Sequence, residues 1–190
     1  MDTRETILAA ALDVLEQDGE ARFSTRRVQA IANVTAPTIY HHFGNVDGLL
    51  GSAVAEAFRR FLASKEAAVS SSDPVTALRE GWDDYVRFAA DRPRLYATMM
   101  TRVLGGARMP AAEQATALLV ERVRAVADTG RLAVAVGVAV DQVWASANAA
   151  ALLHVTAQAR DASQPDPTVV EDLRNRAMRA ILTSHEGERR

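Results

Sequence analysis

The sequence predicts an all-α protein built from a short three-helix N-terminal domain and a larger helical domain after it. Apolar residues recur at three- and four-residue spacing along nearly all of the 190 residues, which is the period of an amphipathic helix. Glycine, proline and capping residues stand between these stripes, where helices end and begin. Only residues 131–140 also alternate like a strand, and no second strand pattern is present to pair with them.

The first two helices are defined by an apolar stripe and by the residues at their ends. The stripe over residues 7–15 predicts the first helix, which ends at Gly19. Ser24 can cap the second helix, because its hydroxyl accepts a hydrogen bond from a backbone amide of the first turn. Asn33 suits the tight turn that follows, because asparagine tolerates the left-handed backbone conformation.

The third helix is short and runs from residue 36 to about residue 42. Thr35 can cap it, and Pro37 stands in its first turn, where the missing amide hydrogen costs nothing. Two short helices joined by a tight turn, behind a longer first helix, are the layout of a helix-turn-helix. The second helix of such a unit enters the major groove of DNA.

Charge is distributed unevenly over this segment. Residues 2–20 contain six acidic residues and one arginine, whereas residues 21–46 contain no acidic residue. The acid-free stretch carries three arginines and two histidines, namely Arg22, Arg26, Arg27, His41 and His42. A local gain of positive charge in a protein of net charge −2 is typical of a surface that contacts phosphate.

Residues at the start of the third helix are small or hydroxylated, which allows close approach to base edges and contact with thymine methyl groups. The tyrosine and histidines that follow can donate hydrogen bonds to phosphates. The candidate DNA-binding residues are Ser24, Thr25, Arg26, Thr35, Ala36, Pro37, Thr38, Tyr40, His41, His42 and Asn45. The structural alternative is an ordinary helical corner, but caps, turn and charge together favour DNA binding.

The second domain, residues 47–190, also reads as helices. A connecting helix is expected over residues 47–69, and a serine-rich stretch before Pro74 ends it. Residues 131–140 are interpreted as a loop that leads into an alanine-rich helix. The further helices are expected over residues 74–90, from residue 93, over residues 110–128, over about residues 138–160, and around residues 170–181.

Composition excludes several classes of protein. The chain has no cysteine, so disulfides, cysteine-ligated zinc and thiol catalysis are excluded. The longest apolar run, Leu132–Val140, has nine residues, and a membrane helix needs about 20. The acidic start MDTRETI does not suit a signal peptide. We therefore expect a cytoplasmic protein with no membrane partner. No catalytic motif stands out, so no catalytic residue, metal or cofactor is expected.

The segments ILAAALDVLEQDG, FSTRRVQAIANV and VTAPTIYHHFGNVDGLL are similar to the DNA-binding domain of the TetR family of transcriptional repressors. The run from Thr38 to Phe43 carries most of this resemblance. The sequence departs from the family pattern at three positions: Gln29 replaces a small alanine, Asn33 replaces the turn glycine, and Val46 replaces a lysine that commonly binds a DNA phosphate in this family. The resemblance covers about a quarter of the chain, residues 4–50, and places the domain boundary after residue 46.

The last two helices have two possible uses: they complete the core of one chain, or they pack across a two-fold axis. The resemblance favours the second use, because the last two helices form a four-helix dimer bundle in this family. The expected interface residues of a homodimer are Ala147, Ala151, His154, Val155, Val170, Leu173, Ala177 and Ile181.

The resemblance also implies a pocket for a small apolar effector between the helices of the second domain. Core packing is the commoner role for any one aromatic residue. The candidate lining residues are Trp82, Tyr85, Phe88, Tyr96, Met99, Met100, Arg102, Val103, Asn148 and Leu152.

The expected function is that of a ligand-responsive regulator, a repressor that binds a palindromic operator as a dimer and releases it when a small molecule binds. Such release requires the effector to bind the released state more tightly than the DNA-bound state. Two alternatives remain: an all-α enzyme, and an architectural DNA-binding protein without an effector.

Overall fold

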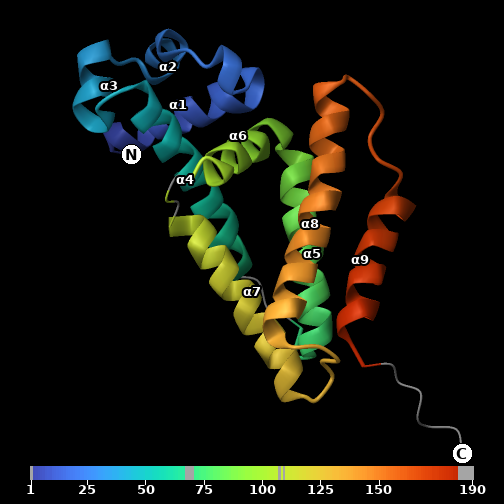
Figure 1. Cartoon of the computed structure of the whole chain (residues 1–190). Helices are drawn as coiled ribbons and strands as arrows, with labels where there is room; N and C mark the ends of the chain where they lie inside the picture. The colour runs from blue at the N-terminus through green and yellow to red at the C-terminus, as the bar shows by residue number, and fades with distance from the viewer. Residues whose placement is uncertain (1, 67–70, 107, 109, 184–190) are drawn as a thin grey trace, which may run out of the picture. The chain divides into compact units, whose positions relative to one another are not determined.

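The predicted fold class is confirmed. The computed structural model describes residues 2–66, 71–106, 108 and 110–183, and over these residues the chain folds into helices without a strand (Figure 1). The elements in chain order are α1 (Thr3–Asp18), the 3-10 helix η1 (Glu20–Arg22), α2 (Thr25–Ala32), α3 (Ala36–Phe43), α4 (Val46–Glu66), α5 (Pro74–Asp91), α6 (Pro93–Leu104), α7 (Pro110–Asp128), α8 (Val136–Ala159) and α9 (Pro167–Ile181). The expected end of the connecting helix at residue 69 lies outside the described residues.

By its packing the chain divides into two compact units. The first unit comprises residues 1–68 and 92–113, and the second comprises residues 69–91 and 114–190. In the first unit α1 packs against α2, α4 and α6, and α3 packs against α4. α6 is thus grouped with the N-terminal helices, although it follows them by almost 30 residues of chain. The functional boundary at residue 46 stays a prediction.

The core of the first unit is formed by the apolar stripe of α1 and the inner faces of α3 and α4. Ile7 and Leu15 of α1, Ile39 of α3 and Leu49 of α4 are all fully buried. These side chains fix α3 on one face only, because α3 is two turns long and its other residues are mostly exposed. The first unit therefore holds the short third helix rigidly and leaves its outer surface open.

In the second unit, α5, α8 and α9 pack against one another and share a single core. Its most buried members include Leu78, Val143, Met178 and Ile181. Two polar contacts connect α5 with α8: Trp82 Nε1 donates to Ser146 Oγ at 2.9 Å, and the Tyr85 hydroxyl donates to Asn148 Oδ1 at 3.1 Å. Both bonds satisfy polar groups that lie near the apolar core, which a buried donor or acceptor requires.

The segment before α8 has a pairing partner that the sequence analysis did not find. Leu132 forms a single antiparallel bridge with Leu182 at the end of α9. Ala133 N donates to Ile181 O at 2.8 Å, and Thr183 N donates to Arg131 O at 3.0 Å. The partner residues are the end of α9 and the two residues after it, which carry no strand pattern. The expected loop is correct for residues 131–135, but α8 begins at Val136 and not at residue 138.

α8 is long and apolar enough, by length and composition, to span a membrane. The count of consecutive apolar residues did not indicate this, because single polar residues interrupt a helix that is apolar on most sides. α8 packs against α5 and α9, and five alanines with Val143 form its buried side. About 28% of its apolar window is buried inside the chain, and the absence of a membrane partner stays a prediction.

Asp73 connects the start of α5 to the segment before α8, and its carboxylate carries a pH dependence. Thr76 donates to it from its amide at 2.9 Å and from its hydroxyl at 2.7 Å, and Arg131 pairs with it. These bonds, those of Thr76 first, lower the pKa of Asp73 from 3.8 to about 2. A carboxyl whose pKa is lower in the folded state stabilises the fold above its unfolded pKa, and this contribution disappears as the pH falls.

We therefore expect the melting temperature of the protein to fall between about pH 4 and about pH 2 with a contribution from Asp73. The variant Asp73→Asn cannot lose this charge, so its melting temperature should fall less steeply over that window. Circular dichroism melts at a series of pH values measure both slopes. Equal slopes in the two proteins would contradict the assignment.

Candidate nucleic-acid interface

The turn between α2 and α3 has the geometry that the sequence predicts. Asn33 adopts the left-handed conformation, with φ 52° and ψ 49°, and ends α2. Val34 N donates to Gln29 O at 3.2 Å and closes the turn. Thr35 precedes α3 in an extended conformation, and Pro37 stands in the first turn of the helix. Gly44, with φ 75°, ends α3. The two short helices therefore form a helix-turn-helix.

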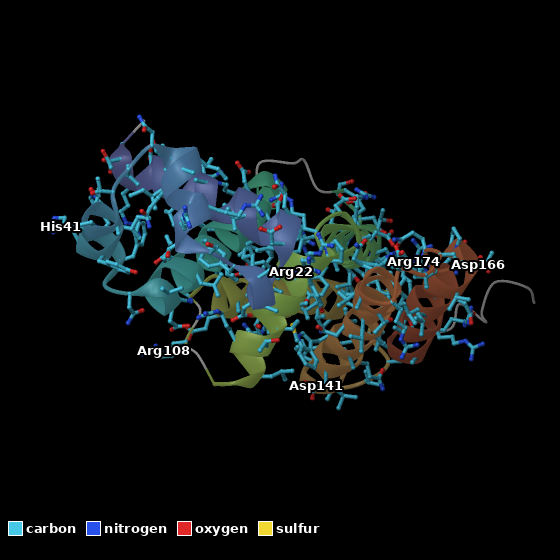
Figure 2. All side chains as sticks on the ribbon, turned by 90° about the horizontal axis from the view of Figure 1, so that it is seen from above. Arg22, His41, Arg108, Asp141, Asp166 and Arg174 are labelled. Carbon is cyan, nitrogen blue, oxygen red and sulfur yellow. The ribbon has the colours of Figure 1, made fainter. Side chains whose placement is uncertain are left out.

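α3 has one buried face and one exposed face. Ile39 and Phe43 point into the first unit. Pro37 and His41 are exposed, and Tyr40 keeps 44% of its surface accessible. Figure 2 shows the labelled His41 projecting outward from α3. The exposed face thus carries the donors that were expected to contact phosphate.

The hydroxyls at the start of α2 and α3 do not cap their helices as expected. Ser24 and Thr35 occupy the N-cap positions, but neither side chain accepts a capping hydrogen bond. The hydroxyls of Thr35 and Thr38 are instead 3.0 Å apart and hydrogen-bond to each other. This bond fixes both side chains at the end of the helix that is expected to meet the bases.

The arginines of the acid-free stretch divide into two groups. Arg27 forms an ion pair with Asp18 and donates from Nη2 to Gln17 Oε1 at 3.0 Å, so its charge is directed at α1. Arg22 and Arg26 are exposed. Asn45 is exposed as well, and its Oδ1 accepts from Gly48 N at 2.8 Å, which caps α4. Ser24, Thr25, Ala36 and Thr38 are half-buried. The other residues expected to contact DNA are exposed: Arg26, Thr35, Pro37, Tyr40, His41, His42 and Asn45.

The residues expected to line an effector pocket are distributed over both units. The first unit holds Tyr96, Met99, Met100, Arg102 and Val103, and the second holds Trp82, Tyr85, Phe88, Asn148 and Leu152. Most of the aromatic side chains are buried, Trp82 and Tyr96 almost completely. Leu152 is an exception, because 55% of its surface is exposed on the outer side of α8. The common pocket stays a prediction.

Most of the residues expected at a dimer interface lie inside their own chain. Ala151 and Ile181 are fully buried, and Ala147 and Ala177 nearly so. Val170 and Leu173 pack against the same core. His154 Nδ1 lies 3.0 Å from Gln164 Oε1, and Val155 is half-buried. The stripe on α9 is thus mainly the inward face of the helix, and the dimer interface stays a prediction.

Another face of α8 carries apolar residues that are exposed. Val138, Ala145, Ala149 and Leu152 are spaced seven, four and three residues apart, so they share one face, and all four are exposed. Trp144 of α8 and Val169 of α9 are further large apolar side chains with about half of their surface exposed. We call Val138, Ala145, Ala149 and Leu152 the outer face of α8.

The polar contacts of α6 and its N-cap with α1 and α4 were not predicted from the sequence. Arg92 pairs with Glu16 at 3.1 Å, and Arg94 donates to the carbonyl of Glu16 at 3.3 Å and to that of Gln17. Arg102 pairs with Asp47 at 2.6 Å. A signal was present, because residues 92–104 carry three arginines and no acidic residue. Periodicity alone gave no indication of their partners.

Comparison with known proteins assigns the N-terminal part of the chain. Residues 7–53 match the family model of the bacterial regulatory proteins of the tetR family. This confirms the resemblance drawn from the sequence, over nearly the same residues. No curated protein matches the chain by sequence.

Solved structures match over almost the whole chain. A protein of unknown function from Rhodococcus sp. RHA1 shares 23% identity over 96% of this chain and 97% of its own, with a TM-score of 0.79. The fatty acid degradation regulator FadR from Bacillus halodurans shares 17% identity over 94% and 95%, with a TM-score of 0.73. A TetR transcription regulator from Haloarcula marismortui shares 18% identity over 96% and 99%, with a TM-score of 0.72. At these identities the likeness concerns the fold.

Proposed function

We propose that this chain is a ligand-responsive transcriptional repressor. The proposal starts from its N-terminal helix-turn-helix, which matches the DNA-binding model of the tetR family. As a homodimer it binds a palindromic operator, and it releases the operator when a small apolar molecule binds to the helical domain. The observation that carries the proposal is the exposed face of α3, which presents hydroxyl, phenol and imidazole groups while Ile39 and Phe43 hold the helix in place.

In the proposed complex, α3 lies in the major groove with its first turn toward the bases. Thr35 and Thr38 are small, and their hydroxyls hydrogen-bond to each other, so they are suited to reading base edges. Tyr40, His41 and His42 are exposed farther along the helix and donate to phosphates. Contacts with phosphates position the protein, and contacts with bases determine the preferred sequence.

These two roles predict different effects of substitution. Thr38→Ala should change the preferred base at one position of each half-site, where a wrong base costs about 1–3 kcal/mol. Tyr40→Phe should weaken binding to all sequences alike, because it removes only a phosphate contact. Selection from a random-sequence duplex pool with each variant measures both effects. An unchanged consensus for Thr38→Ala, or a new consensus for Tyr40→Phe, would reverse the assignment.

The proposed dimer forms through the outer face of α8. Ala145 and Ala149 are small, so two such helices can approach closely, and Val138 and Leu152 flank them. A helix-turn-helix protein reads two half-sites one helical turn apart, about 34–36 Å, and therefore requires two chains. This proposal replaces the interface expected on Ala147, Ala151, Ala177 and Ile181, because those side chains already pack within one chain.

The proposed effector is a small apolar molecule, since most of the candidate lining residues are aromatic or contain sulfur. Methionine side chains adapt to irregular ligands. A ligand that binds the folded protein raises its melting temperature. Thermal-shift screening of the purified protein with a library of metabolites and drugs therefore identifies candidate effectors, and each hit must then lower operator affinity in a binding assay.

Selection of duplexes from a random pool by the purified protein, followed by footprinting, tests the proposed function as a whole. A discrete protected site with an inverted repeat supports the proposed regulator. A broad protection pattern without a consensus would indicate an architectural protein, and no binding would refute a role on DNA.

A further inference from the structure

The N-terminal helices combine a positive helix-turn-helix stretch with a negative net charge. Residues 1–47 contain seven acidic and four basic residues, a net charge of −3 with neutral histidines. Residues 21–46 contain no acidic residue, and Glu20 and Asp47 are the carboxylates that border this acid-free stretch on either side. Carboxylates that border a DNA-binding surface oppose the phosphates unless a nearby positive charge neutralises them.

Arg102 of α6 meets both bordering carboxylates. Its Nη2 lies 2.6 Å from Asp47 Oδ1 and 3.8 Å from Glu20 Oε1. Only 14% of the Arg102 side chain is exposed, whereas the Asp47 side chain is 80% exposed. Arg102 is thus a mostly buried partner of an exposed carboxylate. That carboxylate, Asp47, stands two residues after Asn45, which caps α4.

Gly51 of α4 provides the room for this guanidinium. A Cβ at residue 51 would lie 3.2 Å from Arg102 Nη1, which is tight for any larger side chain. The Nε of Arg102 is buried and has no hydrogen-bond partner among the described residues. A buried donor without a partner costs free energy, so hydrogen bonding of the whole side chain does not explain the position of Arg102. Its contacts with Asp47 and Glu20 do.

Arg92 and Arg94 extend the same arrangement to the end of α1. Arg92 pairs with Glu16 at 3.1 Å, and Arg94 donates to backbone carbonyls of the last turn of α1. Residues 92–104 contribute three positive charges and no negative charge. Taken with residues 1–47, they bring the net charge from −3 to zero.

We infer that α6 offsets the negative charge that borders the helix-turn-helix, and that Arg102 is a positioning residue for operator binding because it neutralises Asp47 and Glu20 at the borders of the acid-free DNA-binding stretch. This inference rests on the proposed role on DNA. Charges interact across a Debye length of about 8–10 Å at moderate salt. An unpaired carboxylate at the border of the stretch that contains α3 therefore repels the DNA phosphates without touching them.

Removal of the positive charge tests this inference. The probes are a duplex selected from a random pool by the wild-type protein and a mixed-sequence duplex of equal length. Arg102→Gln should weaken binding to both probes about tenfold at about 50 mM salt and less than about threefold at about 300 mM salt. Arg102→Lys keeps the charge and should retain most of the affinity.

A second set of variants separates charge from structure. In Glu20→Gln/Asp47→Asn/Arg102→Gln no carboxylate remains to be neutralised, so affinity should return to within about threefold of the wild-type value at low salt. Arg59→Gln is the matched control, because Arg59 forms an exposed ion pair with Glu56 on α4 and should leave binding unchanged. Melting temperatures of all variants show whether each one is folded.

Two outcomes would overturn the inference: Arg102→Gln binds both probes like the wild type, or its loss is equal at both salt concentrations and the triple variant does not recover. Failure of the wild-type protein to select any duplex would instead refute the proposed function, and the mixed-sequence duplex would still test the charge effect.

Discussion

Ala177→Asp is expected to destabilise the second unit strongly. Ala177 is buried on the inner side of α9, next to the fully buried Met178 and one turn from Ile181. A carboxylate placed there has no partner, and an uncompensated buried charge costs about 3–5 kcal/mol. Domains have a total stability of about 5–15 kcal/mol, so a substantial part of the folding free energy of this unit would be lost.

The melting temperature of Ala177→Asp should fall by about 10 °C or more, since about 1 kcal/mol corresponds to 2–4 °C in a protein of this size. Circular dichroism melts measure this directly. Ala180→Asp is the matched control, because residue 180 is exposed on the same helix and should melt within a few degrees of the wild type. If Ala177→Asp keeps its melting temperature and instead becomes monomeric, this face of α9 contacts a second chain and not its own core.

The helix-turn-helix could be predicted closely because its determinants are local. Asn33 sets the left-handed turn, and Pro37 and Gly44 bound α3, so residues a few positions apart specify the motif. The Thr35–Thr38 bond replaced the expected cap because the two hydroxyls lie one turn apart on the same side. Such side-chain choices depend on rotamers, which the order of residues does not reveal.

Contacts between distant residues could not be predicted. Leu132 pairs with Leu182, and Arg102 pairs with Asp47, 55 residues away in sequence. No periodic pattern connects such positions. The arginines of α6 stand on a helix whose inner face has ordinary apolar spacing, so their role became clear only from the packing of α6 on α1 and α4.

The assignment of faces on α8 shows a further limit. Ala147 and Ala151 are buried, whereas Ala145 and Ala149 are exposed. An apolar stripe is required both for a core and for an interface between chains, so a helix that is apolar on several sides leaves the choice open. The alanines predicted for the interface, Ala147 and Ala151, each lie two positions from an exposed alanine.

Ala149→Asp is expected to separate the proposed dimer without unfolding the chain. Ala149 is exposed between Ala145 and Leu152 on the outer face of α8, so a carboxylate there is hydrated in the monomer. In a dimer it would lie opposite its symmetry mate in an interface that buries at least about 1,200–2,000 Å², where unpaired charges cost several kcal/mol. The melting curve of the monomer should therefore remain cooperative while sedimentation shows a single chain.

Loss of the dimer should lower operator affinity by about 100-fold or more, because linked binding of two half-sites gains a factor of about 10²–10⁴ over one. Ala117→Asp is the control, since residue 117 is exposed on α7 and outside the outer face of α8. It should sediment and bind DNA as the wild type does. If Ala149→Asp stays dimeric and protects the operator normally, the two chains meet on another surface, and the outer face of α8 has no part in reading the second half-site.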